Sequence, residues 1–387
     1  MEKQDIVKMF LEKGLQIDPQ SLEYLYNNQE CINSLIEKLI ENNITIVTLD
    51  TIKPFLTEDV IIVKEFKGKP RKISVEDVIK MLRERYEKIS QILSRRFELI
   101  NPISIGKITR KVKNFSLICL VRDKNLEKCS LVVEDGTGET EVFFEKSSED
   151  FRLIVPDEVI GVVCENVDNT IFVKKVVYPD IPFRKDVNRA GEDVYCLFLS
   201  NFCLDSDKLN EKYFQNFLGW LERQKYKNIL IFILGGISSN GDDVEKLLKN
   251  FPSNIKVYLL KSEKDADHKR FDFEDPVLIK VKGLIILLSH GEIFQKYSKI
   301  LEIPIEQTCV VLLRKRHLDP IVEMGKTFED AYLLETVPDI IACGSSTQPS
   351  CLNYKNTTII SCGNFIENPV FWMINLRTRE IFKIDFS

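Results

Sequence analysis

The chain has 387 residues, of which 44% are hydrophobic and 29% are charged, and its formal net charge is −5. This composition argues against intrinsic disorder, and no apolar run reaches the roughly 20 residues that a membrane-spanning helix needs. The acidic balance disfavours a protein that grips DNA alone, because affinity for DNA grows with the number of phosphates neutralised.

Residues 1–58 are predicted to form a small helical domain. The segments DIVKMFLEKG, SLEYLYNN and CINSLIEKLIENN repeat apolar residues at helical spacing and end at glycine or asparagine. The opening residues MEKQDIVKMF lack the basic and then apolar layout of a secretion signal. We therefore expect a cytoplasmic protein with no membrane partner.

Residues 59–98 are predicted to form a basic linker followed by a helix. The basic stretch KEFKGKPRK contains a glycine and a proline, which discourage regular structure. It is either a solvated linker or a strap that contacts phosphates. The candidate DNA contacts in it are Lys67, Lys69, Arg71 and Lys72. Ser74 is the expected N-cap of the helix that follows, with Asp77 three residues later.

Residues 99–185 show short strands separated by turns, which predicts a small β-barrel of the oligonucleotide-binding (OB) type. The segment VVEDGTGETEVFF predicts a hairpin that turns at 135–138. Such a barrel binds single strands by stacking bases on aromatic side chains, or it serves only as structure. Its aromatic residues are few, and the main ones are Phe115, Phe143, Phe144 and Phe172.

Residues 190–387 are predicted to form an α/β domain with a mixed sheet covered by helices. Its apolar runs are expected to be strands: VYCLFLS, NILIFILGG, IKVYLL, VLIKVKGLIILLSHG, CVVLLRK, DIIACG and TTIISCG. Helices are expected at 207–224, 242–250 and 292–302, with Asp242 and Asp243 in the cap and first turn of the second. The ends of such strands are where ligands and metals are usually held.

Two residue types bear on metal binding. The chain has ten cysteines, none in a CxxC pair, and they are expected to be buried free thiols. It has three histidines, His268, His290 and His317, on separate segments. A centre with two metal ions needs several imidazoles and a bridging carboxylate at one place, so three histidines on separate segments are poorly suited to form one.

The barrel followed by this α/β pattern resembles the calcineurin-like phosphoesterases, and most of all the small subunits of archaeal family D DNA polymerases (DNA polymerase II). The resemblance covers residues 99–387 well. The most specific motif in this resemblance is LRKRHLDP, which contains Arg316, His317, Leu318 and Pro320. EDGTGE, VPDIIACG and NPVFWMINL support it. The basic residues 314–316 are either a solvated strand end or part of buried or interfacial salt bridges.

Active phosphoesterases of this class hold two metal ions with aspartate, asparagine and histidine side chains. The resemblance places other residues at most of these positions: Asn201 and Cys203 in the first motif, Gly236 in the second, Glu263 and Lys264 in the third, and Ser345 and Thr347 in the last. His290 is the one matching ligand, and Asp265 survives beside the third motif. The prediction is therefore a chain with no catalytic residue and no metal of its own.

The resemblance implies an accessory subunit that scaffolds a large catalytic subunit as a heterodimer in the nucleoid of an archaeal cell. The partner would supply magnesium-dependent synthesis, and DNA would be reached through the complex. The expected docking surfaces are the barrel's strand edges and the segment with Phe371 and Trp372. One alternative is an active manganese-dependent 3′–5′ exonuclease that proofreads. A weaker alternative is a single-strand-binding module.

Overall fold

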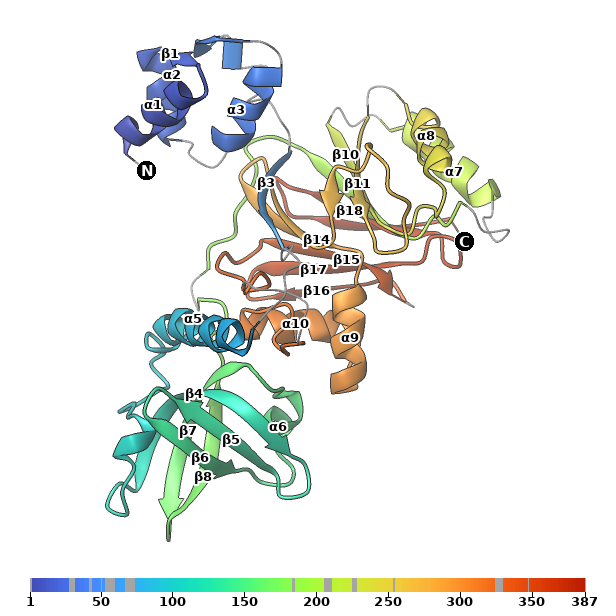
Figure 1. The fold of residues 1–387 in the computed structure, drawn as a ribbon. Helices are drawn as coiled ribbons and strands as arrows, with labels where there is room; N and C mark the ends of the chain where they lie inside the picture. The colour runs from blue at the N-terminus through green and yellow to red at the C-terminus, as the bar shows by residue number, and fades with distance from the viewer. Residues whose placement is uncertain are drawn as a thin grey trace.

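The computed structural model arranges the chain in three parts, as Figure 1 shows. A helical part lies at one end, a closed β-barrel at the other, and a sandwich of two sheets between them. The fold class predicted from the sequence, a helical bundle, a barrel and an α/β sandwich, is confirmed. The described residues are 2–27, 32–41, 44–49, 51–52, 60–66, 74–182, 185–204, 211–224, 228–252, 255–323, 330–346 and 348–386.

The N-terminal part is built from short amphipathic helices around one apolar core. Its elements are α1 (Lys3–Glu12), β1 (Gln16–Ile17), α2 (Pro19–Asn27), α3 (Ile32–Glu41) and β2 (Ile46–Val47). The two short strands pair in parallel, and Ile6, Phe10 and Leu39 are fully buried. Helices this short are marginal alone, so burial of these side chains holds them together.

The segment after the helical part corrects one expectation. Val60–Glu65, which the sequence places in a linker, forms β3 and pairs antiparallel with β13 (Val277–Val281) of the sandwich. The remaining linker residues, including Lys67, Lys69, Arg71 and Lys72, lie outside the described residues. The helix α5 (Val75–Leu93) begins as predicted, because Ser74 Oγ accepts from Asp77 N at 3.2 Å and Asp77 Oδ2 accepts from Ser74 N at 3.0 Å.

The barrel has five strands in the closed order β4-β5-β6-β8-β7. Their bounds are β4 (Asn114–Asn125), β5 (Ser130–Asp135), β6 (Gly138–Phe143), β7 (Val159–Val167) and β8 (Thr170–Val177), with η2 (Ile105–Lys107) before β4 and α6 (Glu149–Leu153) between β6 and β7. The predicted hairpin at 135–138 is present. The Asp135 carboxylate accepts from Thr137 N at 2.7 Å and from Ile105 N at 2.8 Å, so this turn ties η2 to the barrel.

Two features of the barrel bear on its function. The barrel closes through the two pairs Val142–Ile171 and Phe143–Phe172 between β6 and β8, and docking of a partner on its strand edges stays a prediction. Of the four aromatic residues singled out above, Phe115 and Phe144 are buried, and Phe172 is 39% exposed with its ring 6.3 Å from that of Phe143. The outer surface therefore offers little aromatic area for stacking bases.

The sandwich consists of two six-stranded sheets, in the orders β12-β11-β10-β9-β18-β19 and β16-β17-β15-β14-β13-β3. The first sheet contains β9 (Tyr195–Leu199), β10 (Ile229–Leu234), β11 (Lys256–Lys261), β12 (Phe273–Glu274), β18 (Val370–Asn375) and β19 (Ile381–Asp385). The second adds β14 (Leu284–Ser289), β15 (Ile340–Ser346), β16 (Ser350–Tyr354) and β17 (Thr357–Gly363). Apolar side chains such as Phe198, Phe232 and Ile286 form the core between the sheets.

Helices cover both outer faces of the sandwich (Figure 1). α7 (Glu211–Glu222) and α8 (Gly241–Lys249) pack on the first sheet, and α9 (Glu292–Leu301) and α10 (Ile305–Lys315) on the second. The prediction that CVVLLRK is a strand is wrong, because this run lies in α10. A short, fully apolar run fits a buried helix as well as a buried strand. Asn240 caps α8, and Asp242 and Asp243 occupy its first turn, as predicted.

The segment with Phe371 and Trp372 is also corrected. Phe371 is fully buried, and its ring lies 5.2 Å from Phe217 and 5.3 Å from Trp220. Trp372 is partly buried, and its Nε1 donates to Ser361 O at 3.2 Å. Phe371 therefore packs between the first sheet and α7 and offers no surface to a partner, whereas Trp372 packs against the core between the sheets and bonds to β17 of the second sheet.

Two further observations concern the chain as a whole. The nine cysteines in the described ranges form no disulfide, as predicted, and six of them are buried. Within those ranges no helix combines the length and the apolarity that crossing a membrane requires.

Candidate functional site

The loops that leave β9, β10, β11 and β14 meet at the carboxyl ends of these strands. Asn201 follows β9, Gly236 follows β10, and His290 follows β14, so the sheets bring together three residues far apart in sequence. His290 Nε2 lies 3.1 Å from Asn201 Oδ1. We call Asn201, Gly236, Asp265 and His290 the sheet-end cluster.

Position 236 requires a glycine because Asn201 lies directly beside it. The φ of Gly236 is +65°, and a Cβ placed on it would lie 2.0 Å from Asn201 Oδ1. Asn201 also has a positive φ, +56°, and its backbone N donates to Gly235 O at 3.1 Å. Because the amide of Asn201 fills the space beside Gly236, a carboxylate side chain cannot enter at this position without moving Asn201.

Asp265, the surviving acid beside the third motif, is occupied by the protein's own donors. Its carboxylate accepts from the backbone N of Gly236 (3.0 Å), Ile237 (2.6 Å) and Ser238 (3.1 Å), and from both N (2.9 Å) and Oγ (2.7 Å) of Ser262. A carboxylate has about four acceptor sites, so these five bonds use its capacity. Asp265 therefore shapes the loop after β10.

His290 is held on several sides. It is 6% exposed, and its backbone N donates to Asp275 Oδ1 at 2.8 Å. Its Nδ1 lies 3.3 Å from Glu292 Oε1, and this contact lowers the pKa of Glu292. Burial raises the pKa of Asp275 to about 6. The imidazole thus bridges an amide on one side and a carboxylate on the other.

The other positions carried over from the resemblance contribute less. Cys203 is half-buried, and its backbone N donates to Gly236 O at 2.8 Å. Glu263 and Lys264 are exposed in the loop after β11. Ser345 lies in β15, its side chain is not described, and Thr347 lies outside the described residues. Within the described ranges, no group of three or more His, Cys, Asp or Glu side chains is arranged to hold a metal ion.

The LRKRHLDP motif forms a second polar cluster, away from the strand ends that hold the sheet-end cluster. Arg316 ends α10 with a φ of +57° and is 5% exposed. Its Nε donates to Leu334 O at 2.7 Å, and its backbone O accepts from Leu334 N at 2.8 Å. Arg316 therefore fixes the segment that returns past the end of α10.

His317 is neutral in this arrangement. Its Nδ1 accepts from Asp319 N at 3.1 Å, so the ring proton is on Nε2 and donates to Asp330 Oδ1 at 2.7 Å. Burial and the nearby Arg85 lower the pKa of His317 to about 4. Although burial opposes it, contact with His317 and Arg85 lowers the pKa of Asp330.

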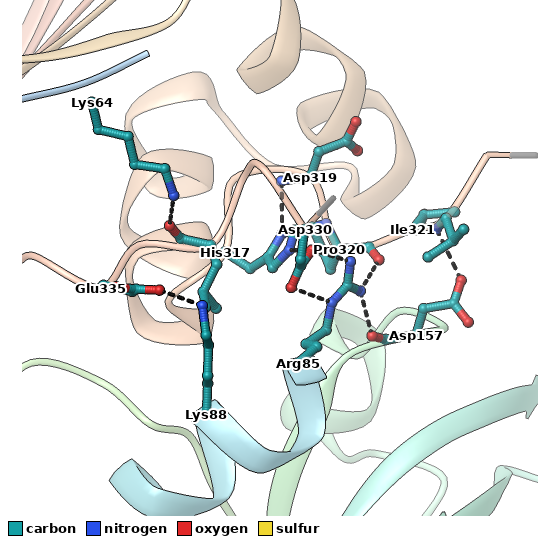
Figure 2. A network of polar contacts seen from close by, with 12 residues as sticks. Lys64, Arg85, Lys88, Asp157, His317, Asp319, Pro320, Ile321, Asp330 and Glu335 are labelled. Atoms are coloured by element: carbon teal, nitrogen blue, oxygen red, sulfur yellow. Dashed lines mark hydrogen bonds and ion pairs between the residues drawn. The ribbon is translucent and has the colours of Figure 1, made fainter. Parts of the chain in front are cut away.

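Arg85 of α5 completes the cluster, as Figure 2 shows. Its Nε and Nη2 donate to the two carboxylate oxygens of Asp330 at 3.0 and 2.7 Å. Its Nη1 donates to Asp157 O, before β7 of the barrel, at 2.7 Å and to Pro320 O. We call Arg85, Asp157, His317, Pro320 and Asp330 the joint, because they connect α5, the barrel and the sandwich.

A third set of contacts reinforces the joint. Lys315 and Glu158 form a fully buried ion pair between α10 and the barrel. The guanidinium of Arg314 lies over the ring of Tyr178 at 4.5 Å. Of the two interpretations of residues 314–316, the one with buried and interfacial contacts is therefore right.

Sequence reasoning missed Arg85 and Asp330. One signal could have found Arg85: it shares the buried stripe of α5 with Met81, Ile89 and Leu93, where a charge needs a partner. No comparable signal exists for Asp330, which lies 245 residues away in the sequence.

The DNA polymerase II small subunit of Archaeoglobus fulgidus is 25% identical, over 88% of this chain and 86% of that protein. The small subunit of Thermoplasma acidophilum is 23% identical over 93% of this chain and 86% of its own length. The small subunit of Pyrococcus furiosus is 23% identical over 81% of this chain and 62% of its own length. The chain is similar to the small subunits of archaeal DNA polymerase II.

This similarity confirms the resemblance seen in the sequence. No family model matches the chain. Among solved structures, an archaeal phosphodiesterase covers 50% of the chain at 8% identity with a TM-score of 0.33. A Vps29 mutant from Entamoeba histolytica covers 50% at 13% identity with a TM-score of 0.30. Scores this low carry no conclusion about the chain.

Proposed function

We propose that the chain is the non-catalytic small subunit of an archaeal DNA polymerase and that it acts by holding a large catalytic subunit in place. The names of its relatives support the first part. The sheet-end cluster supports the non-catalytic, scaffolding role. The main observation for that role is the contact between Asn201 Oδ1 and His290 Nε2, with Gly236 packed against Asn201.

The chemistry of phosphoester hydrolysis gives this observation its weight. In-line displacement at phosphorus by a two-metal site needs cations about 3.5 to 4 Å apart, held by carboxylates and imidazoles. The sheet-end cluster offers a neutral amide, a glycine, one imidazole, and a carboxylate already bonded to backbone N–H groups. Such a set does not neutralise two divalent ions, so the magnesium-dependent chemistry belongs to the partner.

The joint favours a scaffolding role. Domains of one chain usually move relative to one another unless their interface is extensive. Here Arg85 bonds to the barrel and to the sandwich, and Lys315 pairs with Glu158 across the same boundary. A barrel and sandwich fixed in this way present one continuous surface to a large subunit.

Affinity purification of the tagged chain from its native cells tests this proposal. We expect a large polymerase subunit to co-purify, and the isolated chain to contain no manganese above background and to show no manganese-stimulated nuclease activity. A monodisperse monomer in native extract would contradict the scaffolding role. Nuclease activity that disappears in His290→Ala would instead support the exonuclease alternative.

A further inference from the structure

A hollow of about 370 Å³ lies where the barrel meets the sandwich. It is lined by Glu149, Arg152 and Leu153 of α6 and by Ile303, Gln307, Val310, Val311 and Arg314 in and before α10. Because α10 covers the outer face of the second sheet, this hollow is separate from the sheet-end cluster. Four of the eight lining residues are aliphatic, and two are arginines.

Arg314 is held ready to bind an acceptor. Its guanidinium stacks over Tyr178 at 4.5 Å, which fixes the plane of its N–H groups. Its Nε is buried and has no hydrogen-bond partner among the described residues. A buried donor without an acceptor is unfavourable, so the protein itself does not satisfy the Arg314 guanidinium fully.

Arg152 adds a second cation without a partner. It is exposed at the end of α6, and no carboxylate of the described residues lies within ion-pair distance of Arg152 or Arg314. Glu149, which also lines the hollow, forms no ion pair with either. Two guanidinium groups therefore face one recess that contains a single carboxylate.

The residues behind the hollow increase its positive potential. Lys124 Nζ donates to Arg152 O at 3.1 Å and to Ile154 O at 2.7 Å. Burial, together with the charges of Lys315 and Arg152, lowers the pKa of Lys124 to about 8, although Glu158 opposes this. Lys315 and Glu158 neutralise each other. Among the residues that line the hollow, Glu149 is the one acid against Arg152 and Arg314, and Lys124 lies behind them.

We propose that this hollow receives an acidic side chain of a protein partner, flanked by apolar residues, and that Arg152 and Arg314 bind its carboxylate. The planar fork of a guanidinium matches the two oxygens of a carboxylate. The aliphatic walls formed by Leu153, Ile303 and Val310 suit the apolar side chains that flank an acidic residue in a peptide better than they suit the sugar-phosphate backbone of DNA. The partner that carries this side chain is the large catalytic subunit, so this inference rests on the proposed function.

The test measures binding of the full chain to the co-expressed large polymerase subunit by surface plasmon resonance. Arg152→Glu is the main variant, because the Arg152 side chain is exposed and no ion pair holds it. We expect it to weaken binding roughly thirtyfold or more, as charge reversal in an interface does, whereas Arg152→Lys retains most of the affinity. Arg110→Glu, an exposed charge reversal on the barrel outside the hollow, is the matched control and should leave binding unchanged.

A second variant addresses the recessed cation. Arg314→Gln removes the charge but also the stacking on Tyr178, so its melting temperature is measured beside its affinity. At an unchanged melting temperature we expect a loss of binding similar to that of Arg152→Glu. If Arg314→Gln melts early, the Arg152 variants alone decide the question.

The outcomes separate this inference from the proposed function. If the wild-type chain binds the large subunit and Arg152→Glu binds equally well, the inference is wrong and the scaffolding role stands. If the wild-type chain binds no large subunit, the proposed function is wrong, and this inference with it. A poly-dT oligonucleotide is tested in parallel, and binding of this probe that Arg152→Glu abolishes would assign the hollow to phosphates instead.

Discussion

The sheet-end cluster and the joint are both buried polar networks, but they differ in how charge is used. In the joint, the Arg85 guanidinium faces the Asp330 carboxylate through two hydrogen bonds, and His317 completes the set. In the sheet-end cluster, the contact between Asn201 and His290 involves a neutral amide, and the Asp265 carboxylate is bonded to backbone N–H groups. The joint, which connects the domains, is thus built from paired charges, whereas the sheet-end cluster pairs an imidazole with a neutral amide and a carboxylate with backbone N–H groups.

The largest effect is expected from breaking the joint. Arg85→Met removes the cation from a site that is 3% exposed and leaves Asp330 facing only His317. Loss of one partner of a buried ion pair lowers the free energy of unfolding by about 3 to 5 kcal/mol. Chemical denaturation monitored by circular dichroism measures this loss.

Two further variants sharpen that experiment. Arg83→Met lies on the same helix but is exposed, so it should change the free energy of unfolding very little. The double variant Arg85→Met/Asp330→Leu removes both charges and should recover part of the lost stability, since neither group is then buried without a partner. A single Arg85→Met variant as stable as wild type would show that the joint does not hold the domains.

The second prediction concerns pH. The pKa of His317 is about 4 in the folded chain against an ordinary value of 6.5, so the unfolded chain binds this proton at a higher pH than the folded chain. The resulting stability is fully present above pH 6.5 and is lost as the pH falls toward 4, by about 3 kcal/mol in total. Urea denaturation at several pH values between these limits should show this slope.

His317→Gln provides the control for the pH series. The glutamine amide still donates to Asp330 but takes up no proton, so the decrease of stability between the same pH limits should become shallower. The comparison uses the slopes and not the absolute stabilities, because the substitution also alters packing. An unchanged slope would assign the pH dependence to other groups.

How much of this could be predicted from the sequence differs between the two clusters. The turns at Asn201 and His290 follow recognisable apolar strands, so their meeting at one sheet edge was foreseeable. The role of Asp265 was not, because its acceptor sites are used by N–H groups whose direction depends on the loop conformation. The joint depends on Arg85 and Asp330, which are separated by 245 residues, and no local pattern links them.

Errors about secondary structure have similar physical causes. The first five residues of CVVLLRK, 309–313, are all apolar because α10 packs between a sheet and the barrel, so this run shows no helical periodicity. The sequence places Val60–Glu65 in a linker because its pairing partner, β13, is more than 200 residues away in the sequence and a basic, proline-containing segment follows it. The barrel was predicted correctly because its pairings are mostly between neighbouring strands.

A third, smaller effect is expected in the sheet-end cluster. Gly236→Ala places a Cβ 2.0 Å from Asn201 Oδ1 at a φ of +65°. The left-handed conformation alone costs about 1 to 2 kcal/mol, and the clash adds to it. Gly136→Ala is the matched control, because it has open space and no positive φ. Thermal denaturation of both variants should show a lowered melting temperature for Gly236→Ala alone.

The clash itself is isolated by a double-mutant cycle. Asn201→Gly removes the amide and accepts a φ of +56°, so the double variant Asn201→Gly/Gly236→Ala should be destabilised by less than the sum of the two single variants. If the two effects simply add, Asn201 does not fill the space beside Gly236. The explanation for the glycine at this position would then have to be abandoned.

The smallest effect is expected for His290, and it separates a structural role from a catalytic one most directly. His290→Gln retains a donor toward Asn201 Oδ1, now 3.1 Å from the imidazole, so the free energy of unfolding should fall by about 1 kcal/mol or less. A residue that held a catalytic metal would instead lose nearly all activity when replaced, whatever its effect on stability. We therefore expect the complex of this variant with the large subunit to keep the synthesis and nuclease rates of the wild-type complex. A nuclease rate reduced by orders of magnitude at unchanged stability would show that the sheet-end cluster performs hydrolysis after all.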